Sequence, residues 1–385
     1  MAISRRHFIQ TSLLGLTAAA LPMRFAYAVE PTGNKLIVMI LRGALDGLAA
    51  VPAYGDSNYT AARNGLAFND KEGLRDLDGF FALHPSLEQV HALYHNKEAA
   101  ILHACATPYR ERSHFDGQDV LENGMAAKNA QRSGWLNRAM QAQNTHQAVA
   151  ISSNVPLILE GKVPASSWSF SRLPDVNESF YDRLQRMYVE DGLIKQALSD
   201  GMAANMLAGN QKAKGNALKE QASAATKFLK ETGGPDIAVL EKSGWDTHAN
   251  QGTAQGQLSN MLKELDMAIA QIKQDMGPRW KQTTVLVMTE FGRTVAMNGT
   301  KGTDHGTGSM AILAGGGLEG GRMLGEWPGL AKSQLYQGRD LAPANDVRLL
   351  SAMVLHERFA IAADAIQSSI FPGLRYKPLA EGLFT

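Results

Sequence analysis

The chain has 385 residues, of which 44% are hydrophobic and 19% are charged, and its formal net charge is +1. This balance is typical of a globular protein with a large core and excludes a largely disordered chain. With so little net charge, the sequence gives no sign of a nucleic-acid-binding protein or of a protein held on an anionic membrane surface.

Residues 1–28 have the layout of an export signal. Arg5 and Arg6 precede a short apolar stretch, and Ala26 and Ala28 supply the small residues that a signal peptidase reads. Paired arginines are typical of the twin-arginine type, and the apolar stretch is shorter than the roughly 20 residues of a membrane span. The alternatives are an unrelated basic N-terminus or an uncleaved anchor. We expect the twin-arginine export machinery to deliver a mature chain, residues 29–385, to the periplasm or medium, without a stable membrane span.

Six apolar runs predict strands. The first, Lys35–Leu41, is continuous and therefore typical of a buried parallel strand. The others are Ala99–Ala104, Ala148–Ser152, Ile237–Leu240, Thr284–Met288 and Met310–Ala314. The only cysteine, Cys105, follows the second run directly, so we expect a buried structural thiol and no disulfide.

Helical patterns lie between these runs. They cover Pro85–Asn96, Phe180–Leu207, Asn216–Thr232, Gln257–Gln274 and Asp346–His356. Asn216 and Asp346 have the residue types that cap helix N-termini. Strands that alternate with helices predict an α/β fold, with a mostly parallel central sheet and helices on both faces. We expect a single domain over residues 29–385 with a helical insertion at about 165–232.

Polar side chains stand where the predicted strands end. In open α/β sheets, ligands bind beyond the carboxyl ends of the strands. The residues concerned are Arg42 and Asp46 after the first run, Ser113, His114 and Asp116 after the second, Asp246 and His248 after the fourth, Glu290 and Arg293 after the fifth, and Asp304 and His305 before the sixth. Carboxylate oxygens and imidazole nitrogens together favour zinc or manganese, and a guanidinium group matches a phosphate or sulfate oxygen pair.

Several of these residues also have a structural interpretation. Asp46 could simply form a turn. His114 and Asp116 could belong to a helix start. Glu290 could form an ion pair with Arg293 at the end of its strand.

Five strings in this order resemble the secreted bacterial family known as domain of unknown function 1501. They are Leu41–Leu48, Ser113–Asp116, Gly244–His248, Thr289–Thr294 and Gly302–Gly306, and the resemblance spans essentially the whole mature chain. The family is grouped with the alkaline phosphatase and sulfatase superfamily, so the resemblance implies an alkaline phosphatase-like α/β fold with a bimetal hydrolytic centre. The family often occurs beside another secreted protein, which implies a protein partner.

The resemblance also implies roles for single residues. Asp46 matches the first metal-binding Asp of the superfamily, and Asp246 matches the Asp of the second metal site. His305 matches the last metal-binding His. Ser113 stands where a Ser or Thr nucleophile is expected, with Thr107 as the alternative.

Two positions depart from the superfamily pattern. Asn250 stands four residues after Asp246, where a His is usual, and His248 comes earlier instead. Glu290 stands where an Asp-His pair is usual, and Phe291 replaces the His of that pair. These departures imply a single metal ion, a different metal, or a site that has lost hydrolysis.

The sequence therefore predicts a metal-dependent hydrolase of small anionic esters, either phosphates or sulfates. Ser113 would attack, Arg42 or Arg293 would bind the anion, and the metal would be held by Asp46, Asp246, His248 and His305, with Glu290 as a further ligand. A non-catalytic periplasmic binding or assembly protein on the same fold is the alternative. A serine esterase without metal ranks last, because no G-x-S-x-G motif surrounds Ser113.

Overall fold

The structure is a computed structural model that describes residues 33–69, 72–143, 147–170, 178–208 and 218–384. The predicted export signal at 1–28 and the predicted helix cap Asn216 lie outside these residues. No helix in the described ranges combines the length and the apolar composition that crossing a membrane requires.

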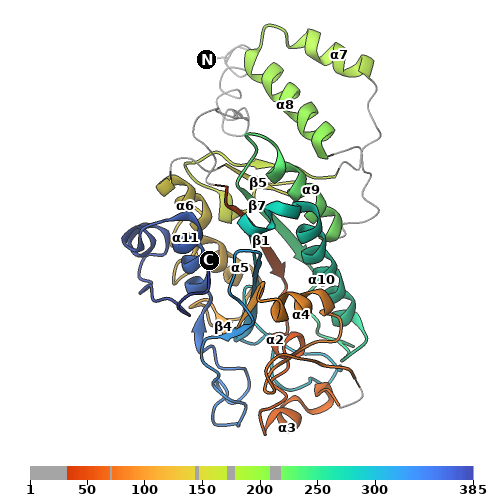
Figure 1. The fold of residues 1–385 in the computed structure, drawn as a ribbon, viewed down its shortest axis with the longest axis vertical. Helices are drawn as coiled ribbons and strands as arrows, with labels where there is room; N and C mark the ends of the chain where they lie inside the picture. Colours follow the sequence, from red (N-terminus) through yellow and green to blue (C-terminus); the bar gives the residue numbers. More distant parts are fainter. Residues whose placement is uncertain (1–32, 70–71, 144–146, 171–177, 209–217, 385) are drawn as a thin grey trace, which may run out of the picture.

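A nine-stranded sheet runs through the described part of the chain (Figure 1). The strand order is β10-β4-β9-β8-β1-β7-β5-β6, and β11 pairs with β4. The strands are β1 Lys35–Arg42, β4 Ala99–Ala106, β5 Ala148–Ala150, β6 Ser166–Ser167, β7 Ile237–Ser243, β8 Thr283–Met288, β9 Ser309–Gly315, β10 Arg322–Leu324 and β11 Asn345–Asp346. A separate antiparallel hairpin joins β2, Arg75–Asp76, to β3, Ala82–Leu83.

The sheet is mostly parallel, as predicted, and all six predicted strands are present. The exception to the parallel arrangement is β9, which runs antiparallel to both β4 and β8. The carboxyl end of β8 and the start of β9 lie at the same end of the strands. The connection between them therefore needs no crossover helix, which a parallel connection would need. Residues that precede β9 therefore lie beside residues that follow β1, β4, β7 and β8.

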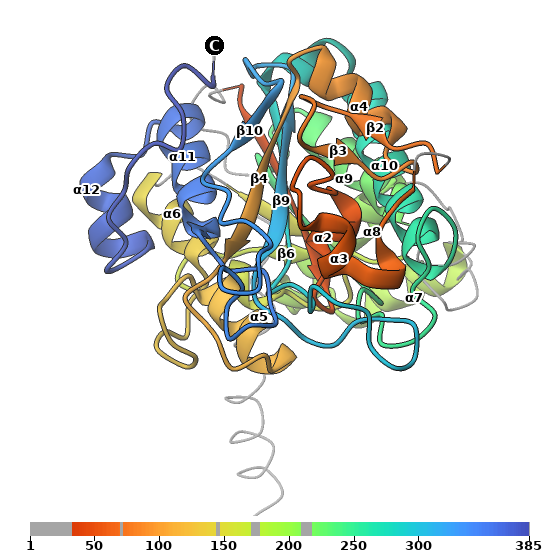
Figure 2. The same cartoon turned by 90° about the horizontal axis from the view of Figure 1, so that it is seen from below.

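Helices cover both faces of the sheet (Figure 2). They are α2 Gly47–Ala50, α3 Tyr59–Arg63, α4 Glu88–His95, α5 His114–Asn123, α6 Trp135–Gln143, α7 Glu178–Met187, α8 Gly192–Ala208, α9 Leu218–Lys230, α10 Gln257–Met276, α11 Val347–Phe359 and α12 Ala363–Ala365. Successive side chains of β1 point to opposite faces. Met39 packs in one core with residues of α4, α9 and α10, and Val38 packs in the other with residues of α6 and α11.

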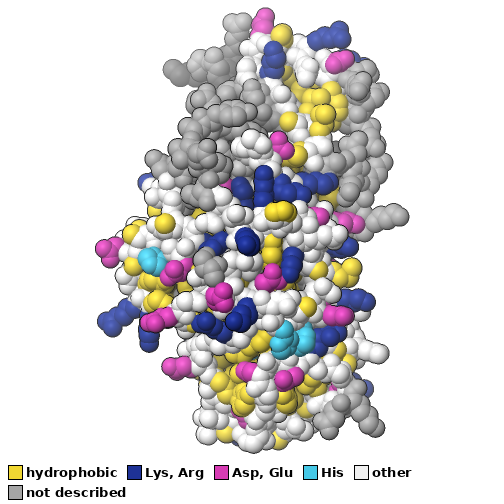
Figure 3. Space-filling model, viewed as in Figure 1, with side chains coloured by type: hydrophobic (Ala, Val, Ile, Leu, Met, Phe, Trp, Pro, Cys, Tyr) yellow, Lys and Arg dark blue, Asp and Glu magenta, His cyan; other side chains and the backbone are white. Residues whose placement is uncertain are grey.

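The described residues of the region predicted as a helical insertion belong to different parts of the fold, and the strand β6 at its start is part of the central sheet. Helix α9 packs against α10 and β7, so it belongs to the layers around the sheet. Helices α7 and α8 extend away from the sheet at the top of Figure 1. They were predicted as one helix, but the Asp191 carboxylate accepts a hydrogen bond from the Ile194 N–H at 3.1 Å, which favours a new helix start. Figure 3 shows hydrophobic side chains exposed over this pair. The exposed hydrophobic residues of this part of the chain include Met187, Val189 and Met206.

Two smaller sequence predictions are also confirmed. Asp346 caps α11, because its carboxylate accepts a hydrogen bond from the Arg348 N–H at 3.0 Å. Cys105 is a free thiol with only 3% of its surface exposed. Burial raises the pKa of the Cys105 thiol, which is the behaviour of an unreactive structural cysteine.

Candidate metal centre

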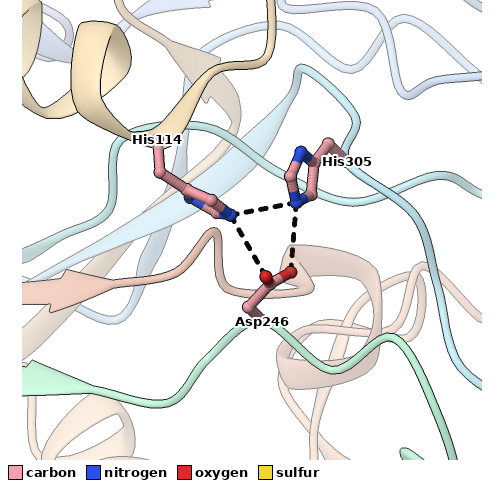
Figure 4. A group of neighbouring side chains, drawn as sticks. All are labelled: His114, Asp246 and His305. Atoms are coloured by element: carbon pink, nitrogen blue, oxygen red, sulfur yellow. Dashed lines mark hydrogen bonds and ion pairs between the residues drawn. The ribbon is translucent and has the colours of Figure 1, made fainter.

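Three side chains from distant parts of the chain meet at the edge where the strands end. His114 is the first residue of α5, Asp246 follows β7, and His305 precedes β9. Figure 4 shows the two imidazoles and the carboxylate pointing toward one another. The His114 Nε2 lies 2.9 Å from the His305 Nε2 and 3.3 Å from the Asp246 Oδ2, and the His305 Nε2 lies 3.2 Å from the Asp246 Oδ1.

A fourth side chain, His248, touches two of these three. Its Nε2 lies 2.9 Å from the Asp246 Oδ1 and 3.0 Å from the His305 Nε2. Its side chain is 47% exposed, whereas those of His114 and His305 are 23% and 28% exposed. His248 therefore closes the side of the cluster that faces solvent.

The hydrogen-bond partners set which nitrogen of each histidine carries the proton. The Nδ1 atoms face acceptors: the Glu290 carboxylate at 2.9 Å from His114, the Arg112 carbonyl oxygen at 3.0 Å from His305, and the Asp304 carboxylate at 3.3 Å from His248. Each Nδ1 must therefore carry the proton and donate it. In the neutral rings the three Nε2 lone pairs then face each other and the Asp246 carboxylate. Such a set of acceptors needs a cation among them, and histidines held in this way are typical of metal ligands.

The surroundings of His114 and His305 shift the pKa values of these two histidines in opposite directions. The hydrogen bond from His114 to Glu290 raises the pKa of His114. Burial lowers the pKa of His305, and the adjacent His114 lowers it further. Of these two rings, His114 is therefore the more basic. A divalent ion bound here would require the Nε2 atoms to be deprotonated.

Arg293 keeps the Asp246 carboxylate ionised. Burial alone opposes ionisation, but the guanidinium group hydrogen-bonds the Asp246 Oδ1 and holds the pKa of Asp246 below its usual value. The same guanidinium group donates to the Thr303 hydroxyl at 3.1 Å, and Arg293 is only 2% exposed. Arg293, which was predicted to bind the anion, thus positions the Asp246 carboxylate, and its guanidinium group hydrogen-bonds protein atoms.

Glu290 supports the cluster from beneath. It is fully buried, and its Oε1 accepts hydrogen bonds from His114, from the Gly43 N–H at 2.8 Å and from the Gln118 amide at 3.2 Å. Gly43 has φ of +116°, and a Cβ there would lie 2.8 Å from the Asp246 N. Only glycine therefore lets the end of β1 come this close to the loop after β7.

Phe291 lines the same centre as an aromatic neighbour. Its ring stacks on His114, with centroids 5.0 Å apart and planes 23° apart, and lies 5.6 Å from the His305 ring. The residue that replaces the superfamily His thus restricts the orientation of two candidate ligands. Asn250, the other departure, is exposed, and its backbone N–H bonds the Thr300 carbonyl oxygen.

Asp46 lies apart from these residues, contrary to the expectation that it would bind the metal. Its Oδ2 pairs with the Arg63 guanidinium group at 2.8 Å and accepts from the Gln251 amide at 2.7 Å. Its Oδ1 accepts from the Ala49 N–H at 3.1 Å at the start of α2. Both oxygens are used, and Asp46 and Arg63 are at most 2% exposed. The structure therefore gives Asp46 a buried structural role.

Arg42 is also bound to protein atoms. Its guanidinium group pairs with Glu122 at 2.8 Å and with Glu241, and it donates to the Gln118 side-chain oxygen at 2.9 Å. Gln118 in turn reaches Glu290. Arg42 therefore connects β1, β7 and α5 beneath the centre, and its charge is balanced by carboxylates.

Ser113 lies in a segment that is tied to the centre on both sides. The carbonyl oxygen of Arg112 accepts from His305, and the side chain of His114 joins the cluster. Ser113 is the N-cap residue of α5, but its side chain makes no capping hydrogen bond. Thr107, the alternative nucleophile, is 1% exposed, and its hydroxyl accepts from the Tyr109 N–H.

His114 is a candidate ligand whose role the sequence left undecided. A helix start and a functional role were both open for it, and the structure combines them, because the first turn of α5 points its imidazole at Asp246. The signal for the functional role was its position after a predicted strand, next to the expected nucleophile.

Comparison with solved structures returns proteins with a similar mixed α/β fold. One is a phosphonate monoester hydrolase of Agrobacterium radiobacter, with a TM-score of 0.37 and 12% identity over 75% of this chain and 70% of that chain. Another is the alkaline phosphatase from the Antarctic bacterium TAB5, with a TM-score of 0.36 and 13% identity over 75% of this chain and 93% of that chain. A third is the zinc complex of the C-terminal periplasmic domain of EcEptC from Escherichia coli, with a TM-score of 0.41 and 8% identity over 91% of this chain and 92% of that chain.

These likenesses concern the overall fold and assign no residue of this chain a role. No curated protein matches the sequence. A family model does match, over residues 34–370, and its description is "Protein of unknown function (DUF1501)". This match covers most of the chain and agrees with the motifs seen in the sequence, so the chain belongs to the DUF1501 family.

Proposed function

We propose that this protein is an exported, metal-dependent hydrolase of phosphate or sulfate esters. The observation that carries the proposal is the meeting of three imidazole Nε2 atoms with the Asp246 carboxylate, each imidazole held by an acceptor at its Nδ1. His114, Asp246 and His305 would hold the ion, and His248 would close the site as a fourth ligand. Zinc or manganese suits this mixture of nitrogen and oxygen donors. The layout of residues 1–28 supports export to the periplasm or medium.

A divalent ion at this position would polarise an ester oxygen and offset the charge of the anionic substrate. Ser113 is the proposed nucleophile, since the carbonyl oxygen of the preceding residue, Arg112, and the side chain of the following residue, His114, both contact the cluster. Its Oγ would form a bond to phosphorus or sulfur while the bond to the ester oxygen breaks, and the alcohol would leave with a proton. Water would later release the phosphate or sulfate from Ser113. Glu290, Arg112 and Arg293 orient the ligands and take no part in bond making.

The second candidate is a non-catalytic binding or assembly protein that uses the same metal centre to hold its structure or a ligand. The ion pairs of Arg42 and Arg293 favour this second candidate. Both arginines were predicted to bind the anion, but each is paired with a carboxylate of the protein itself. A secreted protein partner would then bind to the surface of the folded, metal-bound chain.

Turnover by metal-loaded protein separates the two candidates. The substrates are p-nitrophenyl phosphate and p-nitrophenyl sulfate, tested after loading with Zn²⁺ or Mn²⁺. We expect hydrolysis that Ser113→Ala lowers by a factor on the order of 10³ or more, because a lost nucleophile is among the costliest changes in a hydrolase. Asp246→Ala should lower both turnover and bound metal. His356→Gln is the matched control, since among the described residues the His356 ring contacts the Ile361 carbonyl oxygen and, edge to face, the Tyr376 ring, and neither residue belongs to the cluster.

Equal turnover in wild type and Asp246→Ala would contradict the hydrolase proposal. Stoichiometric metal without hydrolysis of either ester would favour the binding protein instead.

A further inference from the structure

A second pair of histidines stands on the surface of α4, outside the candidate centre. His91 and His95 are one helical turn apart, and their Nε2 atoms lie 3.0 Å from each other. Both atoms also face the backbone carbonyl oxygen of Asp76, at 2.9 Å and 3.3 Å. Two imidazole nitrogens and a carbonyl oxygen thus meet at one point, and His95 is exposed.

Helix geometry brings the two rings together. Residues four apart lie on the same face of a helix, and the ring centroids of His91 and His95 are 4.4 Å apart with planes at 75°. The rings therefore turn their Nε2 edges to the same place and do not stack. This is the spacing with which two histidines of one helix bind a single metal ion.

The carbonyl oxygen is held in place by the β2–β3 hairpin. Asp76 pairs with Ala82 across the hairpin, and the Asp76 carboxylate accepts from the Gly79 N–H at 3.0 Å and from the Tyr54 hydroxyl at 2.5 Å. Arg75 donates to the Pro85 carbonyl oxygen at 2.8 Å, which ties the hairpin to the segment before α4. The three donor atoms are therefore fixed by two elements before any ion arrives.

The surrounding charge favours a cation. The carboxylates of Asp76 and Asp78 stand on the hairpin that supplies the carbonyl oxygen, and the negative charges of both raise the pKa of the nearby Tyr94 after the larger effect of burial. This negative charge on the hairpin favours the binding of a cation over that of an anion.

We propose that His91, His95 and the Asp76 carbonyl oxygen bind one divalent transition-metal ion, Cu²⁺ or Ni²⁺ ahead of Zn²⁺. Two nitrogens that bind one ion at 2.0–2.1 Å are about 2.9 Å apart at a right angle and about 3.4 Å apart in a tetrahedron. The 3.0 Å separation matches the right angle. A tetragonal site with nitrogen and oxygen donors is the preference of Cu²⁺ and Ni²⁺.

The experiment is a titration of chelator-stripped full-length protein with Cu²⁺ alone, by equilibrium dialysis and electron paramagnetic resonance. We expect wild type to bind one equivalent of Cu²⁺ more than His95→Asn does, or to bind that equivalent at least about tenfold more tightly. Loss of a ligand should cost at least this much, since even partners outside the ligand shell change metal affinity by about 10- to 100-fold. The spectrum of that equivalent should show coupling to two nitrogens. His91→Asn should repeat the loss, and His356→Asn should not.

Identical stoichiometry and spectra in wild type, His91→Asn and His95→Asn would overturn the proposal. The result is independent of the proposed hydrolase. His305→Ala changes the candidate centre and leaves the pair on α4 intact. The Cu²⁺ equivalent lost in His305→Ala must therefore differ from the equivalent lost in His91→Asn and His95→Asn. Circular dichroism shows whether each variant keeps the fold.

Discussion

Glu290 sets the state of His114 through one oxygen atom. Its Oε1 accepts from the imidazole, from a backbone N–H of the segment after β1 and from an amide of α5. Burial opposes ionisation of this carboxylate, but these donors hold the pKa of Glu290 below its usual value. The ionised carboxylate in turn makes the His114 Nε2 a stronger ligand.

Replacing this carboxylate should weaken metal binding without removing a ligand. We expect Glu290→Gln to lower affinity for Zn²⁺ by about 10- to 100-fold, because the amide keeps the size of the side chain but loses its charge. Competition with a chromophoric chelator measures the affinity. Glu122→Gln is the control, since that buried carboxylate pairs with Arg42 and touches no histidine of the cluster. Equal affinity in wild type and Glu290→Gln would show that Glu290 does not tune the centre.

Sequence alone predicted which candidate residues gather at the strand ends, where their place follows from topology. Asp246, Glu290 and His305 lie next to strand ends. The order and direction of the strands bring these ends close together, independently of which side chains follow them. Asp46 also follows a strand, but its partners Arg63 and Gln251 come from elements whose approach no local pattern reveals. The direction in which a side chain leaves its loop depends on such distant partners.

Helix α5 carries His114, and the position of α5 depends on close packing at its C-terminal end. The helix ends at Gly124, which has φ of +72°, and a Cβ there would lie 2.8 Å from the Phe371 ring and 2.9 Å from the Trp135 Cβ. Glycine is favoured at this position both because of the left-handed backbone and because of the close packing. A longer side chain must push α5 away from the core that holds His114 in place.

Gly124→Ala should therefore lower the free energy of unfolding by about 2–4 kcal/mol, the sum of left-handed strain and overpacking. Urea unfolding at fixed pH measures the change. Gly338→Ala is the matched control, because Gly338 also has a positive φ, +64°, but has nothing within 4 Å of the added Cβ. We expect the control to lose only about 1–2 kcal/mol. Equal losses in the two variants would show that the packing around Gly124 is not restrictive.

The strands could be predicted because buried parallel strands are continuous apolar runs. The direction of β9 could not be predicted, because an apolar run does not show whether its strand is parallel or antiparallel. The connection from β8 determines that direction. Helix α6 was not predicted, although Trp135 and Leu136 are buried there. Its short pattern contains several polar residues that tertiary contacts bury, among them Asn137 and Arg138.

At the scale of the whole molecule, buried histidines make stability depend on pH. His103 lies on β4 with 2% of its surface exposed, and its Nε2 lies 2.8 Å from the Val51 carbonyl oxygen. Burial lowers the pKa of His103 to about 4, whereas an unfolded histidine titrates near about 6.5. Burial lowers the pKa of His84 as well.

Because the folded pKa is the lower one, the unfolded chain takes up the proton first as pH falls. The contribution of His103 is therefore fully present above about pH 6.5 and is lost progressively toward pH 4, by an amount on the order of 3 kcal/mol. Urea unfolding at pH 7 and pH 5 should show about 2 kcal/mol of this loss in wild type and a smaller loss in His103→Gln. His356→Gln should follow wild type. An unchanged pH dependence in His103→Gln would contradict this assignment.

The α/β class could be predicted from the alternation of strands and helices, because that alternation has few stable layer arrangements. Membership of the DUF1501 family followed from the ordered motifs and is confirmed by the family match. The composition of the centre needed the structure, since it depends on which atoms of His114, Asp246, His248 and His305 face one another.

Anomalous diffraction tests the candidate centre most directly. Crystals of the protein loaded with Zn²⁺ would be measured on both sides of the zinc absorption edge. We predict an anomalous peak bounded by the Nε2 atoms of His114 and His305 and by the Asp246 carboxylate, and its loss in Asp246→Ala. No peak there, with the His114 and His305 nitrogens still in direct contact in the loaded crystals, would contradict the metal centre.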